Sequence, residues 1–215
     1  MKIMKNLGTL ERTLIMAARL ILVTIFALTF TEQAYARDWS GIIGENPLGL
    51  WLWVVVGGLA GTVLMDLTAI AAEKLDITTG GRCGGPQAIG RWTIGLFKAR
   101  FVHENIVDSS SVKYETSTGW ILHYLIGAGL VLTYPLFYLA LSRPMPTDHL
   151  IPGVVWGLAS TVLPWLILYP GYGWGLFGIR APKNASPFIA TPVAHMLYGL
   201  GMGIVLNITS QQWSI

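Results

Sequence analysis

Long apolar runs separated by short polar segments dominate the sequence. Each of the last four runs has roughly the 20 residues that an α-helix needs to cross a bilayer. Backbone groups in lipid must find hydrogen-bond partners within the protein, which favours helices over irregular structure. The pattern predicts an all-α polytopic membrane helix bundle with a four-helix core. The core helices are expected at Leu48–Ala72, Gly119–Leu141, Leu150–Tyr169 and Pro187–Ile208.

A further apolar run, Leu14–Phe30, precedes these four and has two interpretations. Basic residues lie before it, and Ala34-Tyr35-Ala36 after it has the small-x-small form of a secretory cleavage site, which indicates a signal peptide. A retained N-terminal membrane helix fits the length of the run equally well. Residues 1–47 are therefore predicted to be a signal peptide or an extra transmembrane helix with an extracytoplasmic linker. Residues 48–215 are predicted to form the four-helix transmembrane domain.

Composition supports a membrane location and limits the partners. Hydrophobic residues make up 53% of the chain and charged residues only 12%, against about 25% charged residues in soluble proteins. The 14 Lys and Arg residues are spread over short connections and form no basic face, so a nucleic-acid partner is not expected. The expected partners are the lipid bilayer and either further copies of the chain or other membrane subunits. The single cysteine, Cys83, has no second cysteine for an internal disulfide or redox pair.

Basic residues are distributed unequally between the two sides of the predicted bundle. The largest group of Lys and Arg residues lies within residues 73–118, and residues 171–186 add Arg180 and Lys183. The opposite side carries only Arg37 and Arg143. Short loops rich in Lys and Arg usually stay in the cytoplasm. We therefore expect both basic segments to be cytoplasmic.

Three ionisable side chains lie inside the predicted membrane helices: Asp66, His123 and His195. A charged group at the centre of a membrane helix costs roughly 2.5–3.5 kcal/mol on insertion scales, so it usually faces protein, a wet cavity or a partner. The predicted orientation brings all three residues to the cytoplasmic leaflet. Two alternatives stay open. The residues form one shared site for a ligand or proton, or each binds a separate carbonyl, hydroxyl or headgroup.

The predicted helix Leu150–Tyr169 contains one strong helix breaker, and others follow it directly. Pro164 removes a backbone donor, and Pro170 with Gly173 ends or breaks the helix near the cytoplasmic side. Broken helices at membrane depth often build substrate sites in transporters, where the freed carbonyls line a cavity. The alternative is a proline-kinked helix that leaves the membrane through an interfacial aromatic belt. That belt would consist of Trp165, Tyr169, Tyr172 and Trp174.

Glycines recur at small-xxx-small spacing in three of the four core runs. This spacing lets helix backbones approach one another closely, so it predicts tight helix–helix contacts without identifying a function. The pairs are Gly57 with Gly61, Gly153 with Gly157, and Gly199 with Gly203.

The segment between the first two core helices is more than a plain linker. Apolar and basic residues alternate over residues 89–101, which predicts a short amphipathic helix at the lipid headgroups that caps the bundle. Arg91, His103 and Glu104 are further candidates for a ligand or proton site, and we expect His103 and Glu104 to be solvated. The polar residues 108–118 that follow are expected to form a loop.

Six sequence motifs occur in order along the core. They are GTVLMD at 61–66, GRW at 90–92, RFVHENI at 100–106, GWILHYLIG at 119–127, TVLPWLILYPGYGWG at 161–175 and HMLYGLGMG at 195–203. Together they resemble the bacterial membrane proteins of the domain of unknown function 2938 family, over Leu48–Leu206. The resemblance implies a small multi-pass protein of the bacterial inner (cytoplasmic) membrane without an established biochemical role. The extension Met1–Pro47 is not part of the family pattern.

Three classes of function are compatible with these features. A small-solute or proton-coupled transporter, which we favour, would use the intramembrane Asp and His residues to bind cargo or relay protons. A non-catalytic accessory or assembly subunit of a larger membrane complex would need only helix contacts. A metal or haem site is the third class, but no ligand spacing such as HxxxH or CxxCH supports it. No nucleophile turn such as GxSxG occurs, so an enzyme is not expected, and we predict no cofactor and no bound metal.

Overall fold

A computed structural model describes residues 46–74, 85–182 and 187–210 of the chain. Every regular element in these ranges is helical, which confirms the predicted all-α class. The N-terminal apolar run and Cys83 lie outside the described residues, and so does the choice between a signal peptide and an extra helix. The elements are α4 (Pro47–Lys74), α5 (Gly85–Phe97), α6 (Glu115–Leu130), α7 (Thr133–Leu141), α8 (Leu150–Ser160), the π-helical turn η2 (Pro164–Leu168), α9 (Tyr169–Tyr172), the 3-10 turn η3 (Leu176–Gly178) and α10 (Pro187–Thr209).

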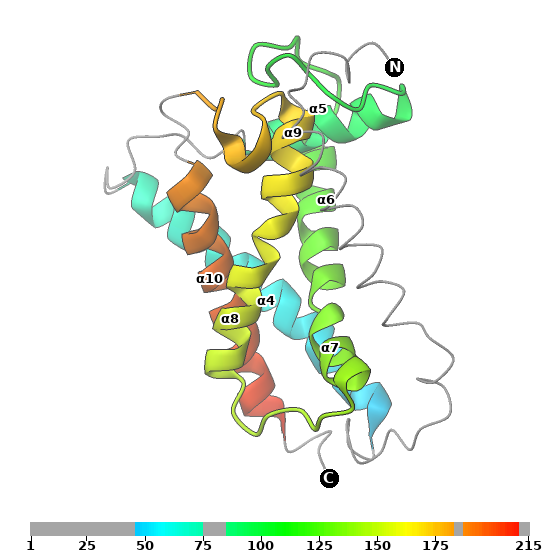
Figure 1. Cartoon of the computed structure of the whole chain (residues 1–215), viewed down its shortest axis with the longest axis vertical. Coiled ribbons are helices and arrows are strands. Elements are labelled where there is room, and N and C mark those ends of the chain that lie inside the picture. Colours follow the sequence, from blue (N-terminus) through cyan, green and yellow to red (C-terminus); the bar gives the residue numbers. More distant parts are fainter. Residues whose placement is uncertain (1–45, 75–84, 183–186, 211–215) are drawn as a thin grey trace.

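Four helical stretches of the described chain are long and apolar enough to cross a membrane (Figure 1). Their number and positions confirm the predicted four-helix core. They are Leu48–Ala71 in α4, Glu115–Leu141 across α6 and α7, Leu150–Tyr172 from α8 to α9, and Pro187–Thr209 in α10.

Helix α6 begins earlier than the predicted start at Gly119. Its first residue is Glu115, whose carboxylate accepts a 2.7 Å hydrogen bond from the backbone N–H of Val112. This bond fixes the connection just before the helix, since Val112 precedes the N-cap residue Tyr114. A carboxylate in the first turn also interacts favourably with the helix dipole. The prediction of a loop over residues 108–118 is therefore wrong for residues 115–118, which are helical.

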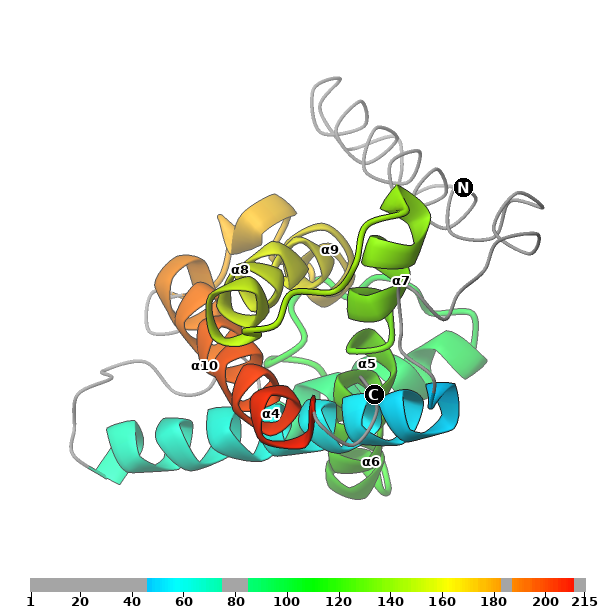
Figure 2. The same cartoon turned by 90° about the horizontal axis from the view of Figure 1, so that it is seen from below.

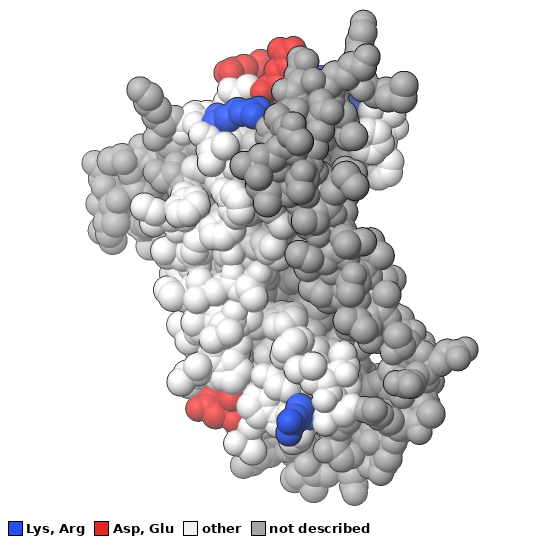
Figure 3. Space-filling view, in the orientation of Figure 1, with Lys and Arg blue, Asp and Glu red and all other residues white. Residues whose placement is uncertain are grey.

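Charged and apolar side chains are segregated along the bundle. On the face shown in Figure 3, the coloured Lys, Arg, Asp and Glu side chains lie near the two ends, and an uncharged band separates them. Large apolar side chains are exposed along the membrane-length stretches, including Leu52 and Leu67 of α4, Ile121 of α6, Val155 of α8 and Ile208 of α10. Such a surface suits lipid better than water.

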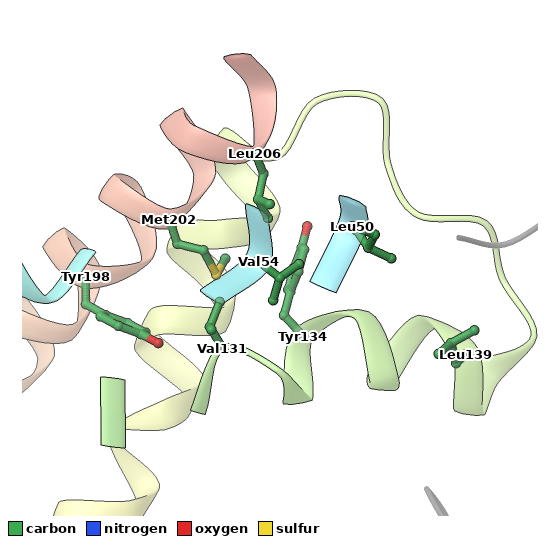
Figure 4. Packing of buried hydrophobic residues seen from close by; sticks show 8 residues of the cluster. All are labelled: Leu50, Val54, Val131, Tyr134, Leu139, Tyr198, Met202 and Leu206. Atoms are coloured by element: carbon green, nitrogen blue, oxygen red, sulfur yellow. The ribbon is translucent and has the colours of Figure 1, made fainter. Parts of the chain in front are cut away.

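Helix α10 is the central packing element. It lies between α4 and α8, and α4 also contacts α6 (Figure 2). Side chains from α10, α4 and the α6–α7 stretch form a buried apolar core (Figure 4). The Tyr198 hydroxyl donates a 2.7 Å hydrogen bond to the Gly127 carbonyl, which ties α10 to α6 as well. The core residues are Leu50, Val54, Val131, Tyr134, Leu139, Tyr198, Met202 and Leu206.

Glycines allow α10 to approach both neighbouring helices at backbone distance. A Cβ atom at Gly157 would lie 2.1 Å from the His195 carbonyl oxygen, and one at Gly61 would lie 2.3 Å from that of Tyr198. Neither distance leaves room for a methyl group. The close contacts predicted from the glycine spacing are therefore present, although a Cβ at Gly57 would meet its nearest atom only at 3.5 Å.

Helix α5 packs against the start of α6 at one end of the bundle, the upper end in Figure 1, which we call the α5 end. A Cβ atom at Gly90 would lie 1.7 Å from the Glu115 carbonyl oxygen, and one at Gly119 would lie 1.7 Å from that of Pro86. The predicted helix is present, but it ends at Phe97, and Ala99 then adopts a positive φ of 56°.

The α5–α6 contact yields a stability prediction. We expect Gly119→Ala to lower the free energy of unfolding by about 1–3 kcal/mol, because the added methyl group overlaps a backbone carbonyl that cannot move freely. Thermal unfolding of the purified protein in mild detergent measures the effect. Gly129→Ala is the matched control, because a Cβ there meets nothing within 4 Å. Equal melting temperatures for the two variants would contradict the packing described.

Candidate functional site

A cavity of about 250 Å³ lies within the bundle near the α5 end. Helices α4, α5, α6, α9 and α10 and the turn η2 all contribute to its lining, most of which is apolar or aromatic. The cavity brings together Asp66 of α4, His123 of α6 and His195 of α10, three residues that are far apart in the sequence. Their function as a ligand or proton site stays a prediction.

Asp66 and His123 are in direct contact. The Nε2 atom of His123 lies 3.2 Å from Oδ1 of Asp66, and both side chains are about one-fifth exposed, at 20% and 19%. The other carboxylate oxygen, Oδ2, is buried and has no hydrogen-bond partner. The His123 ring also packs edge-on against Trp120, with ring centroids 6.0 Å apart. The Tyr124 hydroxyl of α6 is a further neighbour of the Asp66 carboxylate. The site therefore holds a carboxylate with one unsatisfied oxygen beside an imidazole and a phenol.

Local structure explains why Asp66 is the exceptional polar group of its helix. Thr62 and Thr68 flank it, and each donates its hydroxyl to a carbonyl one turn back in α4, Thr62 to Gly58 and Thr68 to Leu64. Such hydroxyls are satisfied by their own helix and tolerate an apolar environment. A carboxylate cannot donate in this way when it is ionised, so Asp66 needs a partner from another element.

His195 has a different partner, Ser160 of α8. The Ser160 hydroxyl lies 2.6 Å from Nδ1 of His195 and donates a 2.6 Å hydrogen bond to the Gly157 carbonyl. A hydroxyl has a single hydrogen to donate. With that hydrogen on the Gly157 carbonyl, Nδ1 of His195 is the donor in the second bond. This arrangement would leave the lone pair of a neutral His195 on Nε2.

Three of the aromatic residues predicted to form an interfacial belt are instead buried. Tyr169, Tyr172 and Trp174 are 2%, 0% and 1% exposed, so they form no interfacial belt. Tyr169 and Tyr172 line the cavity with Trp120, and the Tyr169 hydroxyl bonds that of Thr191 in α10. Sequence reasoning missed Ser160, Thr191 and Trp120. The only signal for the two tyrosines was their three-residue spacing, which places them near each other on a helix.

The helix breakers have separate effects. Pro164 lines the cavity at the start of the π-helical turn, in which the Tyr169 N–H bonds back to the Pro164 carbonyl. Pro170 lies within α9 and causes no break of its own. Gly173 ends the helix with a positive φ of 85°, and a Cβ there would lie 2.1 Å from the Glu104 carbonyl oxygen. Of these three residues, only Pro164 belongs to the cavity lining.

Arg91 does not line the cavity. It connects neighbouring elements of the fold instead. Its guanidinium makes two 2.8 Å bonds to the Glu115 carboxylate, and Nη1 donates to the carbonyls of Ile106 (2.7 Å) and Ser109 (2.6 Å). The bonds to Glu115 raise the pKa of Arg91. One side chain thus joins α5, the following connection and the start of α6.

His103 and Glu104 also lie outside the cavity lining. Glu104 is exposed as expected, but His103 is only 4% exposed, so the expectation that it is solvated is wrong. Its backbone N–H donates to the Gly171 carbonyl (2.9 Å), which holds this segment against α9. Burial and then the charge of Arg100 lower the pKa of His103, which favours the neutral ring.

A second polar cluster, which the sequence did not predict, lies at the end of the bundle opposite α5. His149 is fully buried; its Nδ1 lies 3.0 Å from the Tyr134 hydroxyl, and its backbone N–H donates to Asn207 (2.6 Å). Asn207 in turn donates to the Asp148 carboxylate (2.9 Å). These bonds fasten the start of α8 to α7 and α10. Burial lowers the pKa of His149 to about 4.

A metal site has no support from the geometry of the described residues. Within residues 46–74, 85–182 and 187–210, no group of three or more His, Cys, Asp or Glu side chains is arranged to hold a metal ion. The cavity lining instead contains one carboxylate, two imidazoles and several aromatic side chains. These groups can exchange protons and bind a small polar or cationic molecule.

Four membrane-length helices around a small cavity define the class of fold, a helix bundle suited to crossing a membrane several times. The sequence profile of the family described as "Protein of unknown function (DUF2938)" matches residues 54–208, and the chain belongs to this family. The match confirms the resemblance carried by the six motifs. No curated protein and no solved structure shows a significant match to the chain.

The bonds of Arg91 lead to a second stability prediction. Arg91→Lys keeps the charge but cannot form the paired bonds to Glu115 and both carbonyl bonds together. We expect it to lower the free energy of unfolding by about 2 kcal/mol or more, since hydrogen bonds to charged groups are worth about 1.5–3 kcal/mol each. Thermal unfolding in detergent provides the comparison, with Arg143→Lys at an exposed position as the control. A destabilisation no larger than that of the control would contradict the structural role.

The second polar cluster predicts a pH dependence of stability. Between the ordinary histidine pKa near 6.5 and the folded value of about 4, the unfolded chain binds a proton at His149 that the folded chain does not. The free energy of unfolding therefore falls as the pH falls through this range, by at most ~1.4 kcal/mol per pH unit. We expect the melting temperature to fall more between pH 7 and pH 5 for the wild type than for His149→Asn, whose amide oxygen still accepts a hydrogen bond. Identical pH slopes would exclude this contribution.

Proposed function

We propose that this protein is a proton-coupled transporter of a small solute in the bacterial inner membrane. The observation that carries the proposal is the 3.2 Å contact between Asp66 and His123 in a cavity among membrane-length helices. Ionisable groups at such positions are expensive to insert and usually serve an ion, a proton or a ligand. Histidine also changes charge near neutral pH, which suits proton exchange.

The remaining lining supports both parts of this proposal. His195 supplies a second imidazole, held by Ser160, so that protons have two exchange sites in one cavity. The π-helical turn at Pro164 places irregular backbone beside the same cavity, which is the situation in which transporters tolerate a broken helix. His195 and the π-helical turn thus lie beside the same cavity.

The charges at the two ends favour one orientation. Lys98, Arg100 and Lys113 are exposed at the α5 end, whereas the opposite end has Arg143 close in sequence to Asp148. We therefore place the α5 end in the cytoplasm, following the positive-inside rule. Four spans form a thin wall for alternating access, so we expect two or more copies to act together.

Proton movement tests the proposal. The purified protein is reconstituted into vesicles that contain a pH-sensitive dye, and a potassium diffusion potential drives protons inward. We expect faster acidification than in protein-free vesicles and a loss of at least tenfold in rate with Asp66→Asn, because the carboxylate that exchanges the proton is removed. Asp108→Asn, an exposed residue outside the cavity lining, is the matched control and should keep the wild-type rate.

Two results would overturn the transport proposal. One is acidification at the protein-free rate, and the other is an unchanged rate with Asp66→Asn in correctly folded protein. Purification in mild detergent adds a separate criterion. Other membrane proteins that co-purify in a fixed ratio, together with absent proton flux, would favour a non-catalytic accessory subunit.

A further inference from the structure

We propose that the cavity binds a small primary ammonium ion, a protonated alkyl- or arylalkylamine, whose N–H groups bond Asp66. This inference rests on the proposed function, since it names the class of solute for the same site. The physical basis is an unfilled hydrogen-bonding position on a negatively charged group inside an otherwise apolar and aromatic space.

One oxygen of the Asp66 carboxylate lacks a hydrogen bond. Oδ2 is buried and accepts no hydrogen bond of good geometry from the described residues, whereas Oδ1 lies 3.2 Å from Nε2 of His123, and the Tyr124 hydroxyl is a further neighbour of the carboxylate. An ionised carboxylate accepts several hydrogen bonds, and a buried acceptor without a donor is costly. No Lys or Arg side chain lines the cavity in the described part of the chain. A ligand that brings both an N–H donor and a positive charge would satisfy this oxygen.

The walls of the cavity are chemically suited to an organic cation. Trp120, Tyr169 and Tyr172 line the cavity, and the faces of aromatic rings attract cations. Met65 and Leu168 extend the apolar surface, which suits the carbon skeleton of an amine. The volume of about 250 Å³ is below the roughly 300–1,000 Å³ of sites for drug-sized ligands. The ligand is therefore small.

The ligand and a proton would compete for the same carboxylate. A proton held between His123 and Asp66 and an ammonium ion at Asp66 would neutralise the same negative charge. Other titratable groups at this site are Tyr124 from α6, which interacts with Asp66, His195 from α10, and Tyr169 and Tyr172 from α9; α5 and η2 contribute none to the lining. Binding of an ammonium ion would therefore displace a proton that is held at the pair. This exchange gives the physical link between solute and proton movement.

Calorimetry on the purified full-length chain in mild detergent tests the inference. Benzylammonium is the probe, and benzyl alcohol is its neutral analogue of similar size. We expect benzylammonium to bind at least tenfold more tightly than benzyl alcohol, and at least tenfold more weakly to Asp66→Asn than to the wild type. Tetramethylammonium, which is cationic but has no N–H donor, should bind more weakly than benzylammonium. Asp108→Asn should bind benzylammonium as the wild type does.

The pH dependence of benzylammonium binding is a second test. It can be measured on the wild type and His123→Gln, so it remains available if Asp66→Asn does not fold. Because a proton at the Asp66–His123 pair competes with the ammonium ion, the affinity for benzylammonium should fall as the pH is lowered, by up to tenfold per pH unit. His123→Gln keeps the carboxylate and removes the competing proton, so its affinity should change much less between pH 8 and pH 5.5.

Three outcomes would overturn the inference. They are equal affinity for benzyl alcohol and benzylammonium, full binding by folded Asp66→Asn, and an unaltered pH dependence with His123→Gln. The binding and flux experiments test the two proposals separately. Proton flux without benzylammonium binding would overturn the inference and leave the transport proposal intact, whereas binding without flux would do the reverse.

Discussion

The close approach of α10 to α4 and α8 is the constraint on which the rest of the structure depends. The helix axes can come this near only because glycines face the neighbouring backbones, as at Gly157 and Gly61. In lipid, the hydrophobic effect does not hold helices together, so tight van der Waals packing has to do so. The same contacts bring Ser160 and His195 to bonding distance. A methyl group at the interface would thus separate the helices and also alter the cavity.

The protein contains two kinds of polar structure. At the α5 end, Arg91 and the segment around His103 are engaged in bonds that fasten α5, the 98–114 connection and α9 to one another. Near the same end, the cavity holds Asp66 with one free oxygen. The first set connects structural elements, although Nδ1 of His103 is buried without a hydrogen-bond partner. The second set has an unsatisfied carboxylate oxygen beside a cavity, where a ligand could reach it.

Sequence reasoning succeeded where a single run of residues determines the structure. The length of the apolar runs predicted the four membrane-length helices, and the spacing of the glycines predicted their close contacts. The convergence of Asp66, His123 and His195 followed from their depth in those helices. Prediction from the sequence failed where a contact with a residue far away in the chain determines the local structure. The first residue of α6, Glu115, is bound by Arg91 of α5. The segment at His103 is held against α9 by a backbone hydrogen bond. The position of Tyr172 depends on the π-helical turn that precedes α9.

The bonds between Gly157, Ser160 and His195 link two helices. Ser160 donates its only hydrogen to the Gly157 carbonyl in its own helix and contacts Nδ1 of His195 in α10. The serine thereby connects the backbone of α8 to an imidazole that lines the cavity. Because this connection exists only while the two helices are in contact, any rearrangement that moves α10 away from α8 would also change the hydrogen bonding of that imidazole.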